Sequence, residues 1–220
     1  AIARCMVLEP DVLLLDEPLG ALDLKLREHM KVELKSLQAA FNTTFVYITH
    51  DQSEALVMSD HVAVMNRGVF EQVDTPQNLY NSPDTPFVAQ FVGDNNTWSG
   101  HIRQCDQKSA EIETNDGRLF RTKIRQQLQP GDEVDLFLRP EAMLIEPDAG
   151  LANLNRFEVI VKDLLFDGAN SRLLANPLDA DTELLIAMHQ THQYDYIRKN
   201  DKIEIGWDEQ SGICFPRKKD

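Results

Sequence analysis

Two acidic residues directly follow an apolar run near the start of the chain. Residues 12–15 are one valine and three leucines, and Asp16 and Glu17 come next. This pattern is typical of a strand that is buried on both faces of a parallel sheet and ends in a crevice. Carboxylates in that place suit phosphoryl transfer to water, because one can hold Mg²⁺ while the next orients and polarises the attacking water. The alternative is a strand that merely ends in solvated acids.

A histidine follows a second apolar run. Residues 44–49 are rich in β-branched and aromatic side chains and predict a buried strand that ends at His50. Parallel pairing of the two strands would place His50 at the same sheet edge as Glu17, where it could donate a hydrogen bond to a γ-phosphate oxygen. A capping or core histidine is the ordinary interpretation of such a residue. Its occurrence together with the acidic pair favours the chemical interpretation.

The surrounding pattern predicts the elements that position these side chains. Apolar residues between Leu26 and Phe41 recur at spacings of four, four, three and four, which predicts one face of an amphipathic helix. Asp51 can cap a short helix that ends near residue 58. Residues 61–66 and 69–73 predict two strands joined by a tight turn, and short helices are expected near 77–80 and 87–92. The first unit should therefore be a parallel α/β sheet with an antiparallel finish.

The texture changes from Trp98 onward to short alternating segments separated by Gly, Asn, Asp and Pro. This spacing predicts a small β-barrel or sandwich of Greek-key type, and the strands on either side of residues 147–150 could be two related halves. We place the domains at 1–92 and 93–220. Trp98, Phe137 and Trp207 could be stacking platforms for nucleotide bases or parts of the barrel core, and the acidic composition favours the core.

Composition restricts the partners. The net charge of -14 over 220 residues repels nucleic acid and anionic lipid, and no apolar run approaches the roughly 20 residues that span a bilayer. The three cysteines are widely spaced and suit a reducing cytoplasm rather than a disulfide framework. His189 and His192 stand three residues apart, but without an evident third ligand they favour a polar loop over a metal site.

Three motifs in register resemble those of the ABC ATPases. Residues 12–18 look like the Walker B motif, 19–23 like the D-loop and 47–55 like the switch-histidine motif. The resemblance implies ATP and Mg²⁺ as cofactors, with Asp16 associated with the Mg²⁺ through water, Glu17 as the catalytic carboxylate and His50 as the γ-phosphate contact. It also implies that Asp23 works across a head-to-tail dimer of two nucleotide-binding domains.

Other motifs of that family do not occur in the sequence. It contains neither the Gly-x-x-x-x-Gly-Lys-Ser/Thr phosphate loop nor the Leu-Ser-Gly-Gly-Gln signature, although residues 1–4 resemble the helix that follows the signature. We therefore expect the C-terminal part of a longer ATPase, a partial P-loop NTPase sheet that by itself binds ATP weakly and does not hydrolyse it. Residues 1–92 should expose apolar surface or unpaired strand edges, and should be partly disordered or pair with a second copy.

The second unit resembles the TOBE domain, an OB-like β module of importer ATPase subunits. The resemblance rests on residues 138–141 (Leu-Arg-Pro-Glu), on Gly131-Asp132 before them and on Gly206-Trp207 near the end. Residues 91–98 and 196–215 are most similar to spermidine/putrescine-type subunits. This implies a peripheral protein on the cytoplasmic face of the inner membrane that works with a second copy of itself, with membrane permease subunits and indirectly with a solute-binding protein.

A hypothesis from another class remains open. The missing phosphate loop is also consistent with a non-catalytic module whose β domain mediates dimerisation or binds a regulatory ligand. The two hypotheses differ in whether the complete gene encodes a phosphate loop upstream of this segment.

Overall fold

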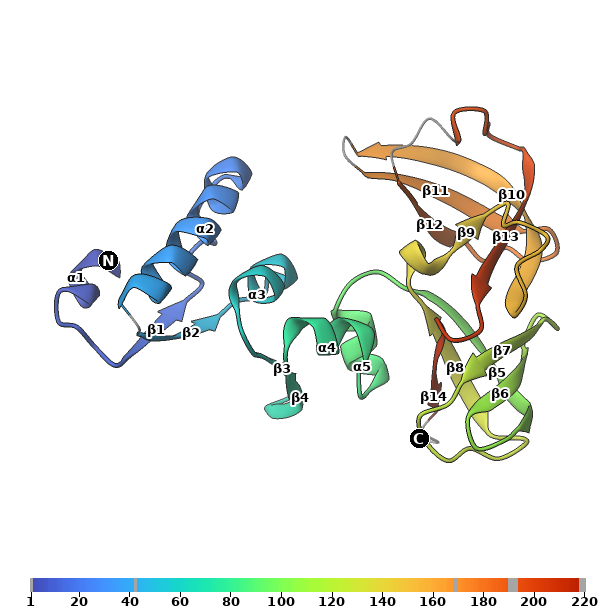
Figure 1. Cartoon of the computed structure of the whole chain (residues 1–220), viewed down its shortest axis with the longest axis horizontal. Coiled ribbons are helices and arrows are strands. Elements are labelled where there is room, and N and C mark those ends of the chain that lie inside the picture. Colours follow the sequence, from blue (N-terminus) through green and yellow to red (C-terminus); the bar gives the residue numbers. More distant parts are fainter. Residues whose placement is uncertain (1, 42, 168–169, 190–193, 218–220) are drawn as a thin grey trace. The chain divides into compact units, whose positions relative to one another are not determined.

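The computed structural model describes residues 2–41, 43–167, 170–189 and 194–217. The chain divides into two compact units, Ala1–Gly93 and Asp94–Asp220, which we call unit 1 and unit 2. Unit 1 is α/β and unit 2 is all-β (Figure 1), which confirms the predicted fold class. Within the described ranges, no helix has both the length and the apolar character needed to cross a membrane.

Unit 1 alternates short strands with helices before it ends in a hairpin and two short helices. Its elements are α1 (Ile2–Met6), β1 (Val12–Asp16), α2 (Leu24–Phe41), β2 (Thr44–Ile48), α3 (Gln52–Met58), β3 (Val62–Asn66), β4 (Val69–Asp74), α4 (Pro76–Asn81) and α5 (Pro86–Phe91). Strands β1 and β2 precede and follow α2 in the chain and pair with each other in parallel. Strands β3 and β4 pair antiparallel, and their turn residues Arg67 and Gly68 both have positive φ, as a two-residue hairpin turn requires.

Side chains cap the short helices of unit 1, and the cap at Asp51 is the one that the sequence predicted. The Asp51 carboxylate accepts hydrogen bonds from the Ser53 and Glu54 amides at the start of α3. Thr75 and Thr85 cap α4 and α5 in the same way, each followed by a proline in the first helical turn. Each cap satisfies amides that the helix itself leaves unpaired, so short local motifs are sufficient to fix where these helices begin.

Only one face of the β1–β2 pair is covered. Leu13 and Leu15 are buried and pack with Met6, whereas Leu14 is 73% exposed and Ile48 is 64% exposed on the opposite face. Unit 1 therefore presents apolar surface to solvent, as expected from the sequence.

The predicted apolar stripe of α2 is only partly buried. Leu34 is 1% exposed, but Leu26 and Phe41 are exposed, and the side chain of Lys31 is buried instead. The helix lies where the apolar spacing predicted it, but Leu26, Leu37 and Phe41 of the stripe are exposed. Lys31 lies beside this stripe on the helix and is buried because it has polar partners on α2 and α3.

The described residues of unit 2 form two five-stranded sheets, with the short 3₁₀ helix η1 between two of the strands. Its elements are β5 (Asn96–Cys105), β6 (Ser109–Thr114), β7 (Leu119–Lys123), β8 (Glu133–Leu138), η1 (Pro140–Ala142), β9 (Leu144–Ile145), β10 (Leu154–Asp167), β11 (Asn170–Pro177), β12 (Leu184–His189), β13 (Lys202–Asp208) and β14 (Ile213–Pro216). One sheet has the order β14-β8-β5-β6-β7 and the other the order β9-β13-β10-β11-β12.

The two sheets show an internal duplication with an exchange of strands. The order β8-β5-β6-β7 in the first sheet has the same connectivity as β13-β10-β11-β12 in the second. Strand β9 follows β8 in the chain but pairs with β13, and β14 follows β13 but pairs with β8. Each half therefore contributes its last strand to the sheet of the other half. The related halves that the sequence suggested are present in the topology.

Local geometry repeats between the halves. Gly131 (φ 91) donates its N–H to the Ile102 carbonyl in the first half, and Asn200 (φ 72) donates to the Val161 carbonyl in the second, both at 2.8 Å. Irregular register follows Ile102 in β5 and Val161 in β10. Asparagine is one of the few residues other than glycine that adopts positive φ readily, which explains how it can stand where the first half has Gly131.

Two buried carboxamides join the sheets. Asn96 on β5 donates to the Leu185 carbonyl and accepts from the Leu185 amide, each at 2.8 Å. Asn155 on β10 makes the same pair of bonds with the backbone of Arg121, at 2.9 and 2.7 Å. Each side chain thus replaces a strand neighbour at an outer strand of the opposite sheet, which satisfies backbone groups that an edge would leave unpaired.

Aromatic side chains fill the space between the sheets. Trp98 and Trp207 stack with ring centroids 5.2 Å apart, and Phe120 contacts both rings edge-on. Trp98, Phe137 and Trp207 are all buried. They are parts of the core, as the composition favoured, and the alternative of exposed stacking platforms for bases was wrong.

Candidate functional site

The carboxyl ends of β1 and β2 bring Glu17 and His50 together. Parallel register places Asp16 opposite Ile48, and the Glu17 amide donates to the Ile48 carbonyl at 2.8 Å. His50 lies two residues beyond Ile48, and its Nδ1 is 2.8 Å from Oε1 of Glu17. The juxtaposition that parallel pairing implied is therefore present, and it joins an acid and a base that are 33 residues apart in sequence.

Glu17 stands at a sharp turn of the backbone. Its φ is 43°, a left-handed value that few residues with a long side chain adopt. The Gly20 amide closes the turn on the Glu17 carbonyl at 3.2 Å, and Leu19 anchors it with a side chain that is 1% exposed. An unfavourable backbone conformation that is held by a buried anchor is typical of functional positions.

Both partners are open to solvent. The side chain of Glu17 is 53% exposed and that of His50 is 79% exposed. An exposed pair of this kind contributes about 0–1 kcal/mol to stability. The contact therefore does little for the fold, while its carboxylate and imidazole remain accessible to a solute.

The other two acids named from the sequence lie near the same chain segment in different roles. Asp16 is the last residue of β1 and is exposed on the uncovered face of the strand pair. Asp23 precedes α2, where its Oδ1 accepts the Leu26 amide at 3.0 Å. Of these four described residues, Glu17 and His50 are the two whose side chains contact each other. The positions of Asp16 and Asp23 are set by the backbone of the strand and the turn, without hydrogen bonds to that pair.

A polar network lies beneath the His50 turn. The Thr49 hydroxyl donates to Oε2 of Glu54 at 2.8 Å and accepts the Asp51 amide at 3.0 Å. Glu54 is itself buried, and Lys31 reaches the same helix through the Ser53 hydroxyl at 2.8 Å. Residues on both sides of His50 are thus held by hydrogen bonds.

Charges around Asp51 favour its ionised form. Partial burial alone would raise the pKa of this carboxyl, but it lies below its usual value because the Glu54 and Ser53 amides donate to it and because Lys31 and Arg27 are nearby cations. A permanent negative charge follows directly after His50. It stabilises the start of α3 through the helix dipole as well as through these hydrogen bonds.

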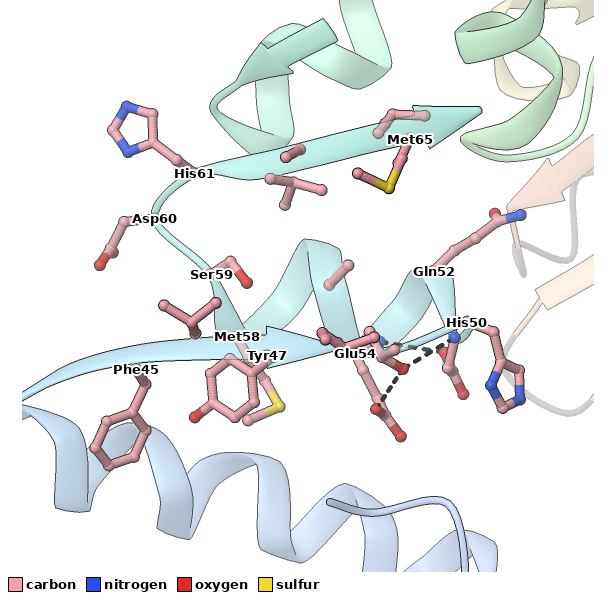
Figure 2. A pocket seen from close by; sticks show the side chains of 18 of the residues that line it. Phe45, Tyr47, His50, Gln52, Glu54, Met58, Ser59, Asp60, His61 and Met65 are labelled. Carbon is pink, nitrogen blue, oxygen red and sulfur yellow. Dashed lines mark hydrogen bonds between the residues drawn. The ribbon is translucent and has the colours of Figure 1, made fainter. Parts of the chain in front are cut away.

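A cleft of about 680 Å³ lies beside the network. Figure 2 shows Phe45 and Tyr47 from β2, Met58 from α3 and Met65 from β3 around it, with Glu54 and His50 at the carboxyl end of β2. Burial raises the pKa of the Tyr47 hydroxyl to about 12. The lining is apolar for the most part, with Lys35 and His61 among its polar residues, so the cleft adds mainly apolar surface next to His50.

The carboxylates suit a Mg²⁺ ion that keeps most of its water. Mg²⁺ in phosphoryl-transfer sites is bound by one or two carboxylates together with phosphate oxygens and water. Asp16 offers an exposed carboxylate of this kind next to Glu17. The described residues contain no cluster of three or more His, Cys, Asp or Glu side chains that could enclose a metal. Of the histidine pair noted in the sequence, His192 lies outside the described residues.

Comparison with known protein families finds a match within the second unit. Residues 136–215 match the model of the TOBE domain. The match begins in β8 and ends in β14, and so covers the second half of unit 2 together with the exchanged strands.

Named relatives cover the whole chain. It is 36% identical over 217 residues to the spermidine/putrescine import ATP-binding protein PotA of Thermobifida fusca, an alignment that covers 98% of this chain and 56% of the relative. It is 49% identical over 154 residues to PotA of Acetivibrio thermocellus, covering 70% of this chain and 42% of the relative. The chain is thus similar over nearly its whole length to proteins that are named as import ATP-binding proteins. It spans about half the length of the curated relatives that it matches.

A shorter match with a higher identity comes from Escherichia coli. The uncharacterized ABC transporter ATP-binding protein YdcT of strain K12 is 65% identical over 100 residues, which is 46% of this chain and 30% of that protein. Among solved structures, the molybdate-binding protein ModG matches with a TM-score of 0.50 and 14% identity, over 56% of this chain and 96% of ModG. At that identity the likeness shows a shared fold alone.

Sequence patterns did not reveal the polar network. Arg27 and Lys31 stand four residues apart on α2, and both contact residues of α3 or its cap. The apolar spacing that predicts this helix carries no information about these two cations. A usable signal was the i, i+4 pair of cations facing the acidic residues Asp51 and Glu54 just after a strand. Sequence alone does not say that two such segments are neighbours.

Proposed function

We propose that this chain supplies the hydrolytic part of the nucleotide site in an ATP-driven importer subunit. The observation that carries the proposal is the 2.8 Å contact between Glu17 Oε1 and His50 Nδ1 at the ends of two parallel strands. In that position Glu17 orients and polarises the water that attacks the γ-phosphate. Nδ1 of His50 faces Glu17, so Nε2 is the nitrogen that faces the phosphate.

The remaining acids complete the proposed site. Asp16 holds Mg²⁺ through its water shell, and the bound ion neutralises charge on the phosphate oxygens. Asp23 lies at the exposed end of the Glu17 turn, where it caps α2. In the proposed arrangement it faces the nucleotide site of a second copy of the subunit.

The partners and the solute are proposed from the relatives. PotA proteins are named for spermidine and putrescine import, and we extend that role to this chain as polyamine or similar small-solute import. The complete protein would act as a homodimer at the cytoplasmic face of the membrane, bound to permease subunits and supplied by a solute-binding protein. The acidic net charge of -14 gives no support for a nucleic-acid partner.

The 220-residue chain alone should bind ATP weakly. Its sequence contains no Gly-x-x-x-x-Gly-Lys-Ser/Thr loop, whose amides and lysine cradle phosphates in P-loop enzymes. Calorimetric titration of this chain with MgATP should show no tight binding. The missing phosphate loop also motivates the competing role, a non-catalytic module whose β domain mediates dimerisation or binds a regulatory ligand, and that role gains if the full-length protein also fails to hydrolyse ATP.

The decisive test is Glu17→Gln in the full-length protein. Removing a general base lowers turnover by about 10²–10⁴-fold, and the amide keeps the size of the side chain. Glu33→Gln makes the same change at an exposed position of α2 and should leave vanadate-sensitive ATPase activity unchanged. Equal turnover of Glu17→Gln and wild type would remove Glu17 from the mechanism.

A further inference from the structure

Arg27, in the first turn of α2, contacts both segments that carry the proposed catalytic pair. Its Nη2 donates to the Leu22 carbonyl at 3.1 Å, and its Nη1 donates to Oδ2 of Asp51 at 3.3 Å. Its Nε lies 3.9 Å from Oε1 of Glu54, within ion-pair range but too far for a hydrogen bond. Three quarters of this side chain is buried, since its exposed fraction is 25%.

The Leu22 contact fixes the turn that carries Glu17. The Leu22 amide donates to the Leu19 carbonyl at 3.1 Å, two residues after the Gly20 amide donates to the Glu17 carbonyl. Leu22 is therefore part of the same compact turn, and its carbonyl would otherwise lie outside the hydrogen bonds of α2. Arg27 joins this carbonyl to the first turn of the helix.

The Asp51 and Glu54 contacts fix the turn that carries His50. Asp51 follows His50 directly and caps α3. Glu54 accepts the hydroxyl of Thr49, the residue that precedes His50. The guanidinium thus contacts two residues that follow the histidine, one of which also binds the residue before it. A rigid fork of five donors is suited to hold several acceptors at once.

We propose that Arg27 is a positioning residue that sets the distance between Glu17 and His50 for the hydrolysis step. Glu17 and His50 are exposed, and such a pair has little energy of its own to hold a 2.8 Å contact. Arg27 supplies the restraint by tying the Glu17 turn and the His50 turn to a single side chain. The inference rests on the proposed function, because positioning matters only if this pair acts on a phosphate.

The test compares Arg27→Gln with Lys25→Gln in the full-length protein. Lys25 is an exposed cation in the same helical turn, so both variants lose one positive charge from α2. A misplacement of about 1 Å can cost on the order of 10²-fold in rate. We expect Arg27→Gln to lower kcat by about 10- to 100-fold with KM for ATP changed less than about threefold, and Lys25→Gln to match wild type.

A double-mutant cycle separates positioning from general damage. If Arg27 acts through His50, adding Arg27→Gln to His50→Ala should lower kcat less than about twofold further, because the residues act as a unit. A merely structural role would lower the rate equally in both backgrounds. Arg27→Lys, which can reach Asp51 or Glu54 but not Leu22 as well, should retain more activity than Arg27→Gln and less than wild type.

Two outcomes would overturn the proposal for Arg27, and a third would overturn the proposed function on which it rests. Independent, multiplicative effects of Arg27→Gln and His50→Ala would show that Arg27 does not act through the pair. Wild-type kcat in Arg27→Gln would show that the restraint is unnecessary. Wild-type kcat in His50→Ala would instead refute the proposed function itself. If Arg27→Gln does not fold, the Arg27→Lys variant in both backgrounds gives the same cycle.

Discussion

Replacing Asn96 by alanine should destabilise unit 2 more than the same replacement at Asn155 or Gln127. The Asn96 carboxamide is 4% exposed and forms two hydrogen bonds with the backbone of Leu185. Its removal breaks both bonds and leaves the amide and carbonyl of a half-buried residue without a partner. Each bond contributes about 1 kcal/mol net, and each unsatisfied buried group costs about 1–3 kcal/mol. Because Leu185 keeps some solvent access, we expect a loss of about 2–4 kcal/mol.

The equivalent change in the second half should cost less. Asn155 makes the same two bonds with Arg121, but Arg121 is an exposed residue, so water can replace the lost partners. Asn155→Ala should therefore cost about 1–2 kcal/mol. Gln127→Ala removes an exposed amide and should stay within about 0.5 kcal/mol of wild type.

Urea denaturation of the whole chain, followed by tryptophan fluorescence, measures these differences. The two tryptophans, Trp98 and Trp207, both lie in unit 2, so the signal reports on that unit even though unit 1 is present. The midpoint should fall without a change in m-value, since the surface exposed on unfolding stays the same. Equal midpoints for Asn96→Ala and Gln127→Ala would refute the reasoning, as would a greater loss from Asn155→Ala than from Asn96→Ala.

Three further predictions concern Cys214 and Gly100. At pH 8 a thiol reagent should modify exposed Cys5 in the native chain but Cys214 only after unfolding, as read by mass spectrometry, because burial and nearby Asp135 raise the pKa of the Cys214 thiol from 9.0 to about 12. Since only the unfolded thiol ionises between these values, Cys214 should lower stability as pH rises through that window, and Cys214→Ala should lack this contribution. Gly100→Ala should cost at least about 2 kcal/mol, because its Cβ would lie 2.3 Å from the Glu113 carbonyl oxygen, whereas Gly150→Ala meets no atom closer than 3.4 Å.

Much of unit 1 could be predicted because its signals are local. Asp51, Thr75 and Thr85 cap the helices that follow them, and Arg67 and Gly68 form the expected hairpin turn. The meeting of Glu17 and His50 was also accessible, since two parallel neighbouring strands must end at the same edge. These inferences need only nearby residues and one assumption about strand pairing.

What sequence could not supply is the identity of distant neighbours. Nothing local indicates that Lys31 is buried, because its burial depends on Ser53, which is 22 residues away. Similarly, an asparagine at position 96 gives no sign that its partner is the backbone of Leu185, 89 residues later. Polar groups of this kind are stable only in a particular tertiary setting, so their patterns carry information only after the fold is known.

The exchange of strands in unit 2 also determines which part of the chain is a folding unit. The segment that matches the TOBE family begins at residue 136, and its first and last strands, β8 and β14, pair with each other. That segment leaves out β5, β6 and β7, which complete the sheet of β8. Without them, one face of the aromatic core would be open, since Trp98 and Phe120 lie on β5 and β7. Because each half contributes a strand and a buried asparagine to the other, the core can close only when both halves are present, and the independent unit is therefore the whole of residues 94–220 rather than the matched segment.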